Sequence, residues 1–142
     1  MNISASRPTI AETLMDELDL PFWEGCRLGS FLVHQCSVCG QSYWPASACT
    51  QHGGDRMVWT KASGTGVIHT FTIIHQRYHP AFDKDRPYNV IVVRLEEGPL
   101  VHSRLIDFAP EDLRIGRHVA VRFETVGADI LPMFAPVRPL RP

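Results

Sequence analysis

Hydrophobic and polar residues alternate along most of the chain after Gly54, as they do in β-strands that bury one face. The clearest example is 119–124, where two valines and a phenylalanine occupy every second position. Pro132 and Pro136 restrict the last such segment to the edge of a sheet, because proline lacks the amide hydrogen that a central strand needs. The segments with this β-branched and aromatic character are 57–62, 67–75, 90–95, 100–106, 119–124 and 131–137.

Turn-forming residues separate these segments. The sequence Glu-Glu-Gly-Pro at 96–99 predicts a hairpin, so that 90–95 and 100–106 become antiparallel neighbours. A longer connection at 77–87 lies between two strands, and long loops in small domains often carry function. About five strands with short turns indicate a small closed barrel of the OB type, although an SH3-like barrel or a compact sandwich has a similar number of strands.

The N-terminal region has a helical pattern instead. Thr9 and Glu12 have the spacing of a capping box, and Ile10, Leu14 and Leu18 recur every four residues, which predicts an amphipathic helix over 9–18. A proline then introduces a second short segment at 22–28, whose paired aromatic residues are expected to pack against a larger body.

Composition and charge narrow the class of protein. The chain has 142 residues, of which 44% are hydrophobic and 20% charged, as in ordinary globular domains. Its net charge is -1, with 14 basic and 15 acidic side chains, which disfavours a nucleic-acid partner. No apolar run approaches the roughly 20 residues that a membrane-spanning helix needs, and the first residues lack an apolar signal core. We therefore expect a cytoplasmic protein without a membrane partner.

Metal-ligating residues are concentrated between the helical and the strand-rich regions. Cys36 and Cys39 form one pair, Cys49 and His52 form a second, and a glycine follows each pair directly. Two such pairs supply the four ligands of a tetrahedral zinc ion, with iron as the rival metal. The zinc is expected to be structural, since no carboxylate follows the pairs in a general-base arrangement. Cys26 is expected to be a packed thiol rather than a ligand.

The remaining polar residues form no recognisable catalytic motif. A nucleophile elbow, a phosphate-binding glycine loop and a dinucleotide fingerprint are all absent from the sequence. Several arginines and aromatic residues could converge on a phosphorylated ligand, or could equally be surface charge and barrel core. These residues are Arg77, Arg86, Arg94, Arg104, Phe71, Tyr78, Phe82 and Tyr88.

The order of these motifs resembles one family in particular. The matching motifs are Phe22-Trp23-Glu24, Cys36-Ser-Val-Cys39-Gly, Trp44-Pro45, the second metal pair, Ser63-Gly64-x-Gly66, His79-Pro80-Ala81-Phe82, Pro87-Tyr88, 95–99 and Asp112-Leu-Arg-Ile-Gly116. Together they cover about 20–137. The family is acyl-CoA-associated, pairs a rubredoxin-like zinc ribbon with an OB-fold domain, and was long catalogued as a domain of unknown function. Its fourth ligand is usually cysteine, whereas this chain has His52, which is also a competent zinc ligand.

The resemblance implies a mainly β fold, with an N-terminal helical segment at 1–28, a zinc ribbon at 29–60, a five-stranded OB-fold domain at 61–138 and a tail at 139–142. It also implies a non-catalytic accessory subunit that binds a thiolase-fold enzyme, a lipid-transfer-protein-like aldolase, or a hot-dog-fold hydratase. A CoA thioester would be shared with that partner. The residues expected to contact CoA, from their position in the long loop, are Tyr78, His79, Phe82 and Arg86.

Two other functions are compatible with parts of the sequence. An OB-fold barrel can bind single-stranded nucleic acid through aromatic platforms and a basic groove, although the near-neutral charge speaks against it. A zinc hydrolase is the weaker alternative, because it would need an open coordination position and a general base.

Overall fold

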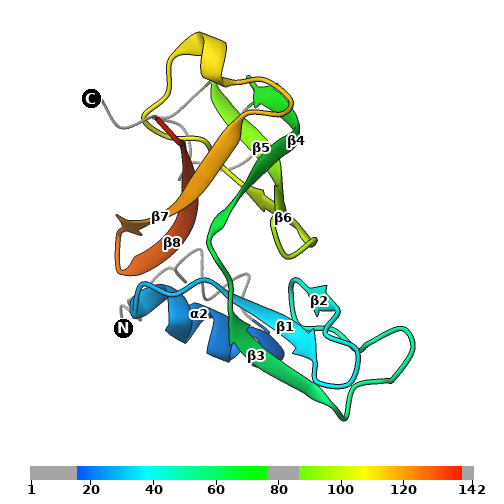
Figure 1. Ribbon diagram of the computed structural model, residues 1–142. Coiled ribbons are helices and arrows are strands. Elements are labelled where there is room, and N and C mark those ends of the chain that lie inside the picture. Colours follow the sequence, from blue (N-terminus) through cyan, green and yellow to red (C-terminus); the bar gives the residue numbers. More distant parts are fainter. Residues whose placement is uncertain (1–15, 77–86, 139–142) are drawn as a thin grey trace, which may run out of the picture.

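The computed structural model describes residues 16–76 and 87–138, which form one N-terminal helix and two β-sheets (Figure 1). The elements are η1 (Glu17–Asp19), α2 (Leu20–Arg27), β1 (Leu32–Cys36), β2 (Ser42–Tyr43), β3 (Met57–Lys61), β4 (Thr65–Ile74), β5 (Tyr88–Leu95), β6 (Leu100–Ser103), η3 (Pro110–Asp112), β7 (His118–Val126) and β8 (Asp129–Pro136). Within these described residues, none of the helices is long and apolar enough to cross a bilayer.

The helix α2 accounts for the second helical segment expected from the sequence. Pro21 stands in its first turn, where a missing amide hydrogen has no cost, and Arg27 ends it. Its buried face carries Phe22, whose ring meets that of Phe31 edge-on with centroids 5.1 Å apart. The earlier helix expected at 9–18 lies mostly outside the described residues. Its last two residues, Glu17 and Leu18, belong to the short 3-10 turn η1 instead.

The smaller sheet has the strand order β2-β1-β3, with both pairs antiparallel. β1 pairs with β3 from Leu32 opposite Lys61 to Cys36 opposite Met57, so that β1 ends at the first metal-ligating cysteine. The segment 57–61 therefore belongs to the ribbon sheet and not to the barrel. The chain then passes through 62–64 directly into β4, as Figure 1 shows.

The larger sheet has five strands in the order β6-β5-β4-β7-β8 and curls into a barrel, which confirms the predicted OB-type fold. β5 and β6 form the hairpin predicted at 96–99. β8 is the last strand in this order, as its prolines predicted. Its free side is nevertheless covered, because Leu105 and Phe134 form a parallel bridge and Ile106 donates a backbone hydrogen bond of 2.9 Å to Phe134.

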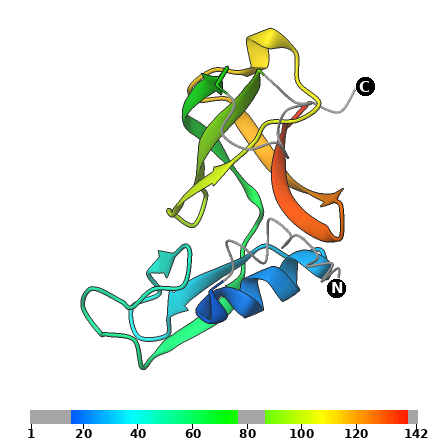
Figure 2. The ribbon, with the colours of Figure 1, turned by 180° about the vertical axis from the view of Figure 1, so that it is seen from behind.

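One apolar cluster joins the ribbon to the barrel. Phe31, next to β1, lies 6.3 Å from Phe134 of β8 between ring centroids, and both side chains are buried. Phe22 and Cys26 of α2 belong to the same cluster, as do the barrel residues Ile91 and several valines. Figures 1 and 2 show the ribbon and α2 stacked beneath one end of the barrel from opposite sides. The two sheets thus share a core.

A buried carboxylate fixes the turn η3 and the end of the described chain. Asp112 accepts a hydrogen bond from the backbone amide of Ala109 (2.8 Å) and pairs with Arg117 (3.1 Å) and Arg138 (2.9 Å). The Ala109 amide, followed by the two guanidinium groups, lowers the pKa of this carboxyl below its usual value against the opposing effect of burial.

We expect Asp112→Asn to lower the melting temperature at neutral pH. Because the carboxyl pKa is depressed in the folded state, its stabilising effect is present above the unfolded pKa of about 3.9 and is lost as pH falls through the folded value. The melting temperatures of the variant and the wild type should therefore converge at the lowest pH tested. Glu111→Gln is the matched control, since Glu111 is exposed. An equal difference in melting temperature at all pH values would contradict this account.

Candidate metal centre

The first pair of metal-ligating residues is held by a tight backbone turn at the end of β1. The amide of Cys36 donates to the carbonyl of Gln41 (2.9 Å), and the amide of Gly40 donates back to the carbonyl of Cys36 (2.8 Å). Gly40 has φ +77°, a conformation that side-chain-bearing residues rarely adopt. The turn projects the thiol groups of Cys36 and Cys39 to the same side of the chain.

The second pair has the same construction. Cys49 and Gly53 exchange two backbone hydrogen bonds of 3.0 and 2.9 Å, and Gly53 has φ +72°. His52 lies within this turn, three residues after Cys49. Each turn thus needs a residue with positive φ directly after the pair, and Gly40 and Gly53 meet this need. The tight turns allow the ligand side chains of both pairs to converge.

The ligand atoms of the four side chains form one cluster. Their ligand atoms all lie within 4.8 Å of one another, with 3.7 Å between the sulfurs of Cys39 and Cys49. The Nδ1 atom of His52 lies 3.7 Å from the sulfur of Cys36 and 3.6 Å from that of Cys49. A tetrahedron with zinc–ligand bonds of ordinary length places its ligand atoms about 3.6 to 3.8 Å apart. Three thiols and one imidazole at this spacing could bind a metal ion.

Backbone amides favour a thiolate at one corner of the cluster. The backbone amide of Gln51, followed by the hydroxyl of Tyr43, lowers the pKa of Cys49 to about 6. At Cys39, which is exposed, the backbone amide of Gln41 lowers the pKa, but partial desolvation of the sulfur and the neighbouring thiols of Cys49 and Cys36 together raise it above its usual value. A cation at the centre would favour the thiolate form of every cysteine ligand.

Cys26 lies apart from this group. It is 1% exposed in the shared core, and burial raises the pKa of its thiol to about 12. It is therefore a packed neutral thiol, as the sequence suggested.

Tyr43 is a residue of the site that the sequence analysis did not single out. Its hydroxyl accepts a hydrogen bond of 3.2 Å from the backbone amide of Thr50, between Cys49 and His52. Because Tyr43 belongs to β2, this contact fixes the second turn to the ribbon sheet. Only its position in the strand after the first cysteine pair could have indicated this role.

A second set of contacts anchors the chain that leads to Cys49. The amide of Ser47 donates to Nδ1 of His34 (2.9 Å), and the ring of His34 lies 4.5 Å from that of Trp59 between centroids. The amide of Ala46 donates to the carboxylate of Asp19, beside α2 (2.9 Å). These contacts tie the chain segment before Cys49 to the ribbon strands and to the helical segment.

The residues expected to contact CoA belong to the long connection between β4 and β5. Tyr78, His79, Phe82 and Arg86 lie outside the described residues. Of the arginines considered with them, Arg94 contacts Nδ1 of His69 (3.3 Å) near the end of β5, whereas Arg104 lies over the ring of Tyr88 at its beginning. These two guanidinium groups therefore do not converge on one ligand.

Comparison with known protein families identifies similarity in both halves of the chain. A family model described as "ChsH2, C-terminal OB-fold domain" matches residues 59–124. A "DUF35 domain-containing scaffold protein" of Methanothermobacter thermautotrophicus is 32% identical over 96 residues, which cover 65% of this chain and 70% of the relative.

A "Probable enoyl-CoA hydratase alpha subunit" of Thermomonospora curvata is 30% identical over 125 residues, which cover 85% of this chain. The chain spans only 38% of that protein's length. Among solved structures, a chain of the "Ltp2-ChsH2(DUF35) aldolase" matches with a TM-score of 0.76 and 26% identity, covering 87% of this chain and 97% of that chain.

Proposed function

This chain belongs to the DUF35 family, and we propose on that basis that it is a non-catalytic subunit that binds a thiolase-fold aldolase or acyltransferase. The observation that carries the proposal is the match to the aldolase chain, which extends over 87% of this chain and 97% of the other. The match includes the ribbon as well as the barrel. Both parts of this chain that could contact a partner therefore have a counterpart in the aldolase chain.

The metal centre supports a scaffolding role. We assign zinc to Cys36, Cys39, Cys49 and His52, because three thiols and one imidazole form a donor set that zinc favours. Four protein ligands complete a tetrahedron and leave no position for a reacting water. The zinc would hold together a small sheet that has little core of its own, and it would supply no chemistry to a substrate.

The substrate proposed for the complex is a CoA thioester, held jointly by this subunit and its partner. The proposal follows from the family resemblance and from the hydratase alpha subunit to which this chain is similar. In that complex the partner supplies the nucleophile and the acid and base groups. The similarity to the hydratase alpha subunit also makes a hot-dog-fold hydratase a second proposed partner.

Co-expression tests this function directly. The full chain, carrying an affinity tag, is produced together with the thiolase-like protein encoded nearest to it, and with a thiolase from an unrelated pathway as control. We expect a stable complex with the first protein only, and aldolase or acyl-transfer activity that requires both subunits. Turnover of an acyl thioester by this chain alone, or failure to bind the thiolase-like protein at micromolar concentrations, would refute the proposal.

A further inference from the structure

The strands β4 and β5 continue beyond the closed part of the barrel. β4 pairs with β7 over 65–67 and then runs beside β5 as far as Ile74. There the two strands form one wall of a pocket, at the end of the barrel that lies away from the metal centre (Figure 1). The pocket has a volume of about 600 Å³, within the range of sites that bind small organic ligands.

The β4 wall turns apolar side chains toward the inside of the barrel. Residues that lie opposite each other on antiparallel strands point to the same face of the sheet. Phe71 lies opposite Ile91, which is 0% exposed, and Ile73 lies opposite the buried Asn89. Ile73 therefore faces inward, yet it is 48% exposed. Aliphatic surface on an inner face that remains in contact with water favours an apolar ligand that would cover it.

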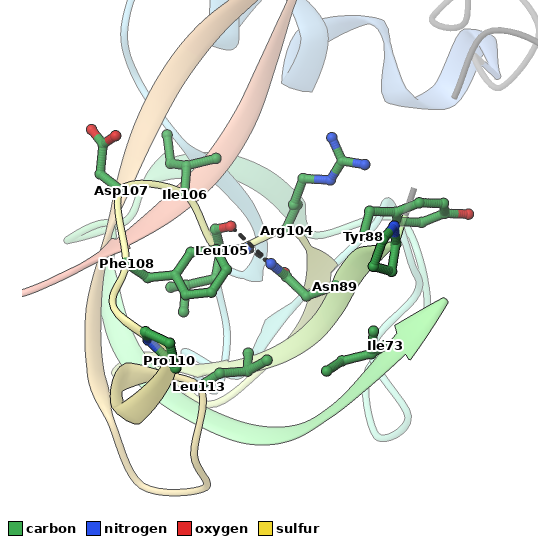
Figure 3. Close-up of a pocket in the computed structure, with 11 residues that line it drawn as sticks. Ile73, Tyr88, Asn89, Arg104, Leu105, Ile106, Asp107, Phe108, Pro110 and Leu113 are labelled. Atoms are coloured by element: carbon green, nitrogen blue, oxygen red, sulfur yellow. Dashed lines mark hydrogen bonds between the residues drawn. The ribbon is translucent and has the colours of Figure 1, made fainter. Parts of the chain in front are cut away.

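The segment after β6 supplies the opposite wall. Phe108 is 40% exposed and Leu113 is half-buried, and Figure 3 shows both side chains around the same space as Ile73. Asn89 ties the two walls together, because its side chain accepts from the amide of Leu105 (2.7 Å) and donates to the carbonyl of the same residue (3.0 Å). A wall fixed in this way reduces the ordering cost of binding.

The two charged residues of the lining already have partners. Asp107 is paired with Arg122. Arg104 lies over the ring of Tyr88, with the guanidinium carbon 4.8 Å from the ring centroid, and both of these residues have further interactions. Among the described residues of the lining, no charge is therefore left for a ligand. A charged group bound here would lose its hydration without gaining a counter-ion.

We propose that this pocket binds an uncharged hydrocarbon ligand, whose body lies against Ile73, Phe108 and Leu113. The apolar walls and the paired charges both favour this class of ligand over an organic anion or a nucleic acid. A peptide segment fits less well, because its backbone amides would lie against apolar side chains without hydrogen-bond partners. The site belongs to this chain alone, so the inference does not rest on the proposed scaffolding role.

Two dyes with the same ring system test the class of ligand. N-phenylnaphthylamine is uncharged, whereas anilinonaphthalene sulfonate carries the same rings with one negative group. With the full chain we expect saturable fluorescence enhancement by the uncharged dye at one site per chain, and about tenfold weaker binding of the sulfonate. Equal or tighter binding of the sulfonate would reveal an available positive charge and would overturn the assigned class.

Substitutions in the two walls test the location of the site. Phe108→Ala should weaken binding of the uncharged dye about tenfold, and Ile73→Thr several-fold while keeping a β-branched residue in the strand. Leu100→Ala and Val58→Thr are matched controls, because Leu100 and Val58 are 41% and 46% exposed and neither lines the pocket. The controls should bind the dye like the wild type, and equal losses in Phe108→Ala and Leu100→Ala would contradict the proposal.

Amide chemical shifts provide a measurement that does not depend on variant stability. The uncharged dye, titrated into labelled wild-type protein, should shift the resonances of 73, 105–108 and 113 and leave those of 36–52 unchanged. Shifts in both regions, or a titration that does not saturate, would overturn the site. Displacement of the dye by the thiolase-like partner would show that a partner side chain fills the pocket, which would overturn the small-ligand site and leave the scaffolding role intact.

Discussion

Replacing Cys36 with serine should leave the purified chain without stoichiometric zinc and with its ribbon unfolded. Cys36 is fully buried at the end of β1, and its sulfur lies 3.7 Å from Nδ1 of His52. Zinc binding by small tetrahedral sites contributes on the order of 10 kcal/mol to folding, which exceeds what the short ribbon strands can supply. Metal analysis, together with hydrogen exchange of β1 and β3, measures the loss.

Cys26→Ala is the matched control for this experiment. It removes a thiol of similar burial, 1% exposed, that lies outside the metal-ligating group. We expect Cys26→Ala to retain zinc and a protected ribbon. A Cys36→Ser protein that bound zinc as tightly as the wild type, or wild-type protein that contained no zinc when purified without chelator, would refute the assignment of the metal centre.

Replacing Phe134 with alanine should destabilise the barrel and the ribbon together, by about 3–5 kcal/mol. Phe134 is fully buried, and its ring lies 6.3 Å from that of Phe31, next to β1. The backbone of Phe134 also closes the barrel, because its amide donates a hydrogen bond to the carbonyl of Arg104 and its carbonyl accepts one from the amide of Ile106. The deletion therefore leaves a cavity where the two sheets meet, and denaturant unfolding measures the change in the free energy of unfolding.

The exposed Phe71 provides the comparison for Phe134. Phe71→Ala removes a side chain of the same size that is 37% exposed, so its effect should stay below about 1 kcal/mol. Unfolding followed at a ribbon residue and at a barrel residue should shift by the same amount in Phe134→Ala. Two separate transitions, with only the barrel affected, would show that the sheets do not share one cooperative core.

The strand pattern predicted most of the barrel because alternation is a local property. The period of two in 119–124 follows from side chains that point to opposite faces of one strand, and the hairpin at 96–99 depends on its own four residues. The spacing of the two pairs predicted the convergence of three thiols and one imidazole for the same reason. Each pair needs only one tight turn, and Gly40 and Gly53 supply the positive φ angles.

The details of the N-terminal region were predicted less well. The periodicity of Leu14 and Leu18 indicated a helix that continued to Leu18, but Asp16 caps a short 3-10 turn instead by accepting a hydrogen bond from the amide of Leu18. A capping side chain competes with the helical continuation, and sequence periodicity alone does not show which arrangement prevails.

The sequence by itself determined the strands, their turns and the two pairs of Cys and His residues that could bind a metal ion, because each depends on contacts between residues close together in the chain. The tertiary structure decided how distant segments meet. It placed the bridge between Leu105 and Phe134, the shared core at Phe31, and the pocket beside Phe108. These contacts join residues far apart in sequence, and they arise only when the curled sheet brings its ends together, so no local pattern encodes them.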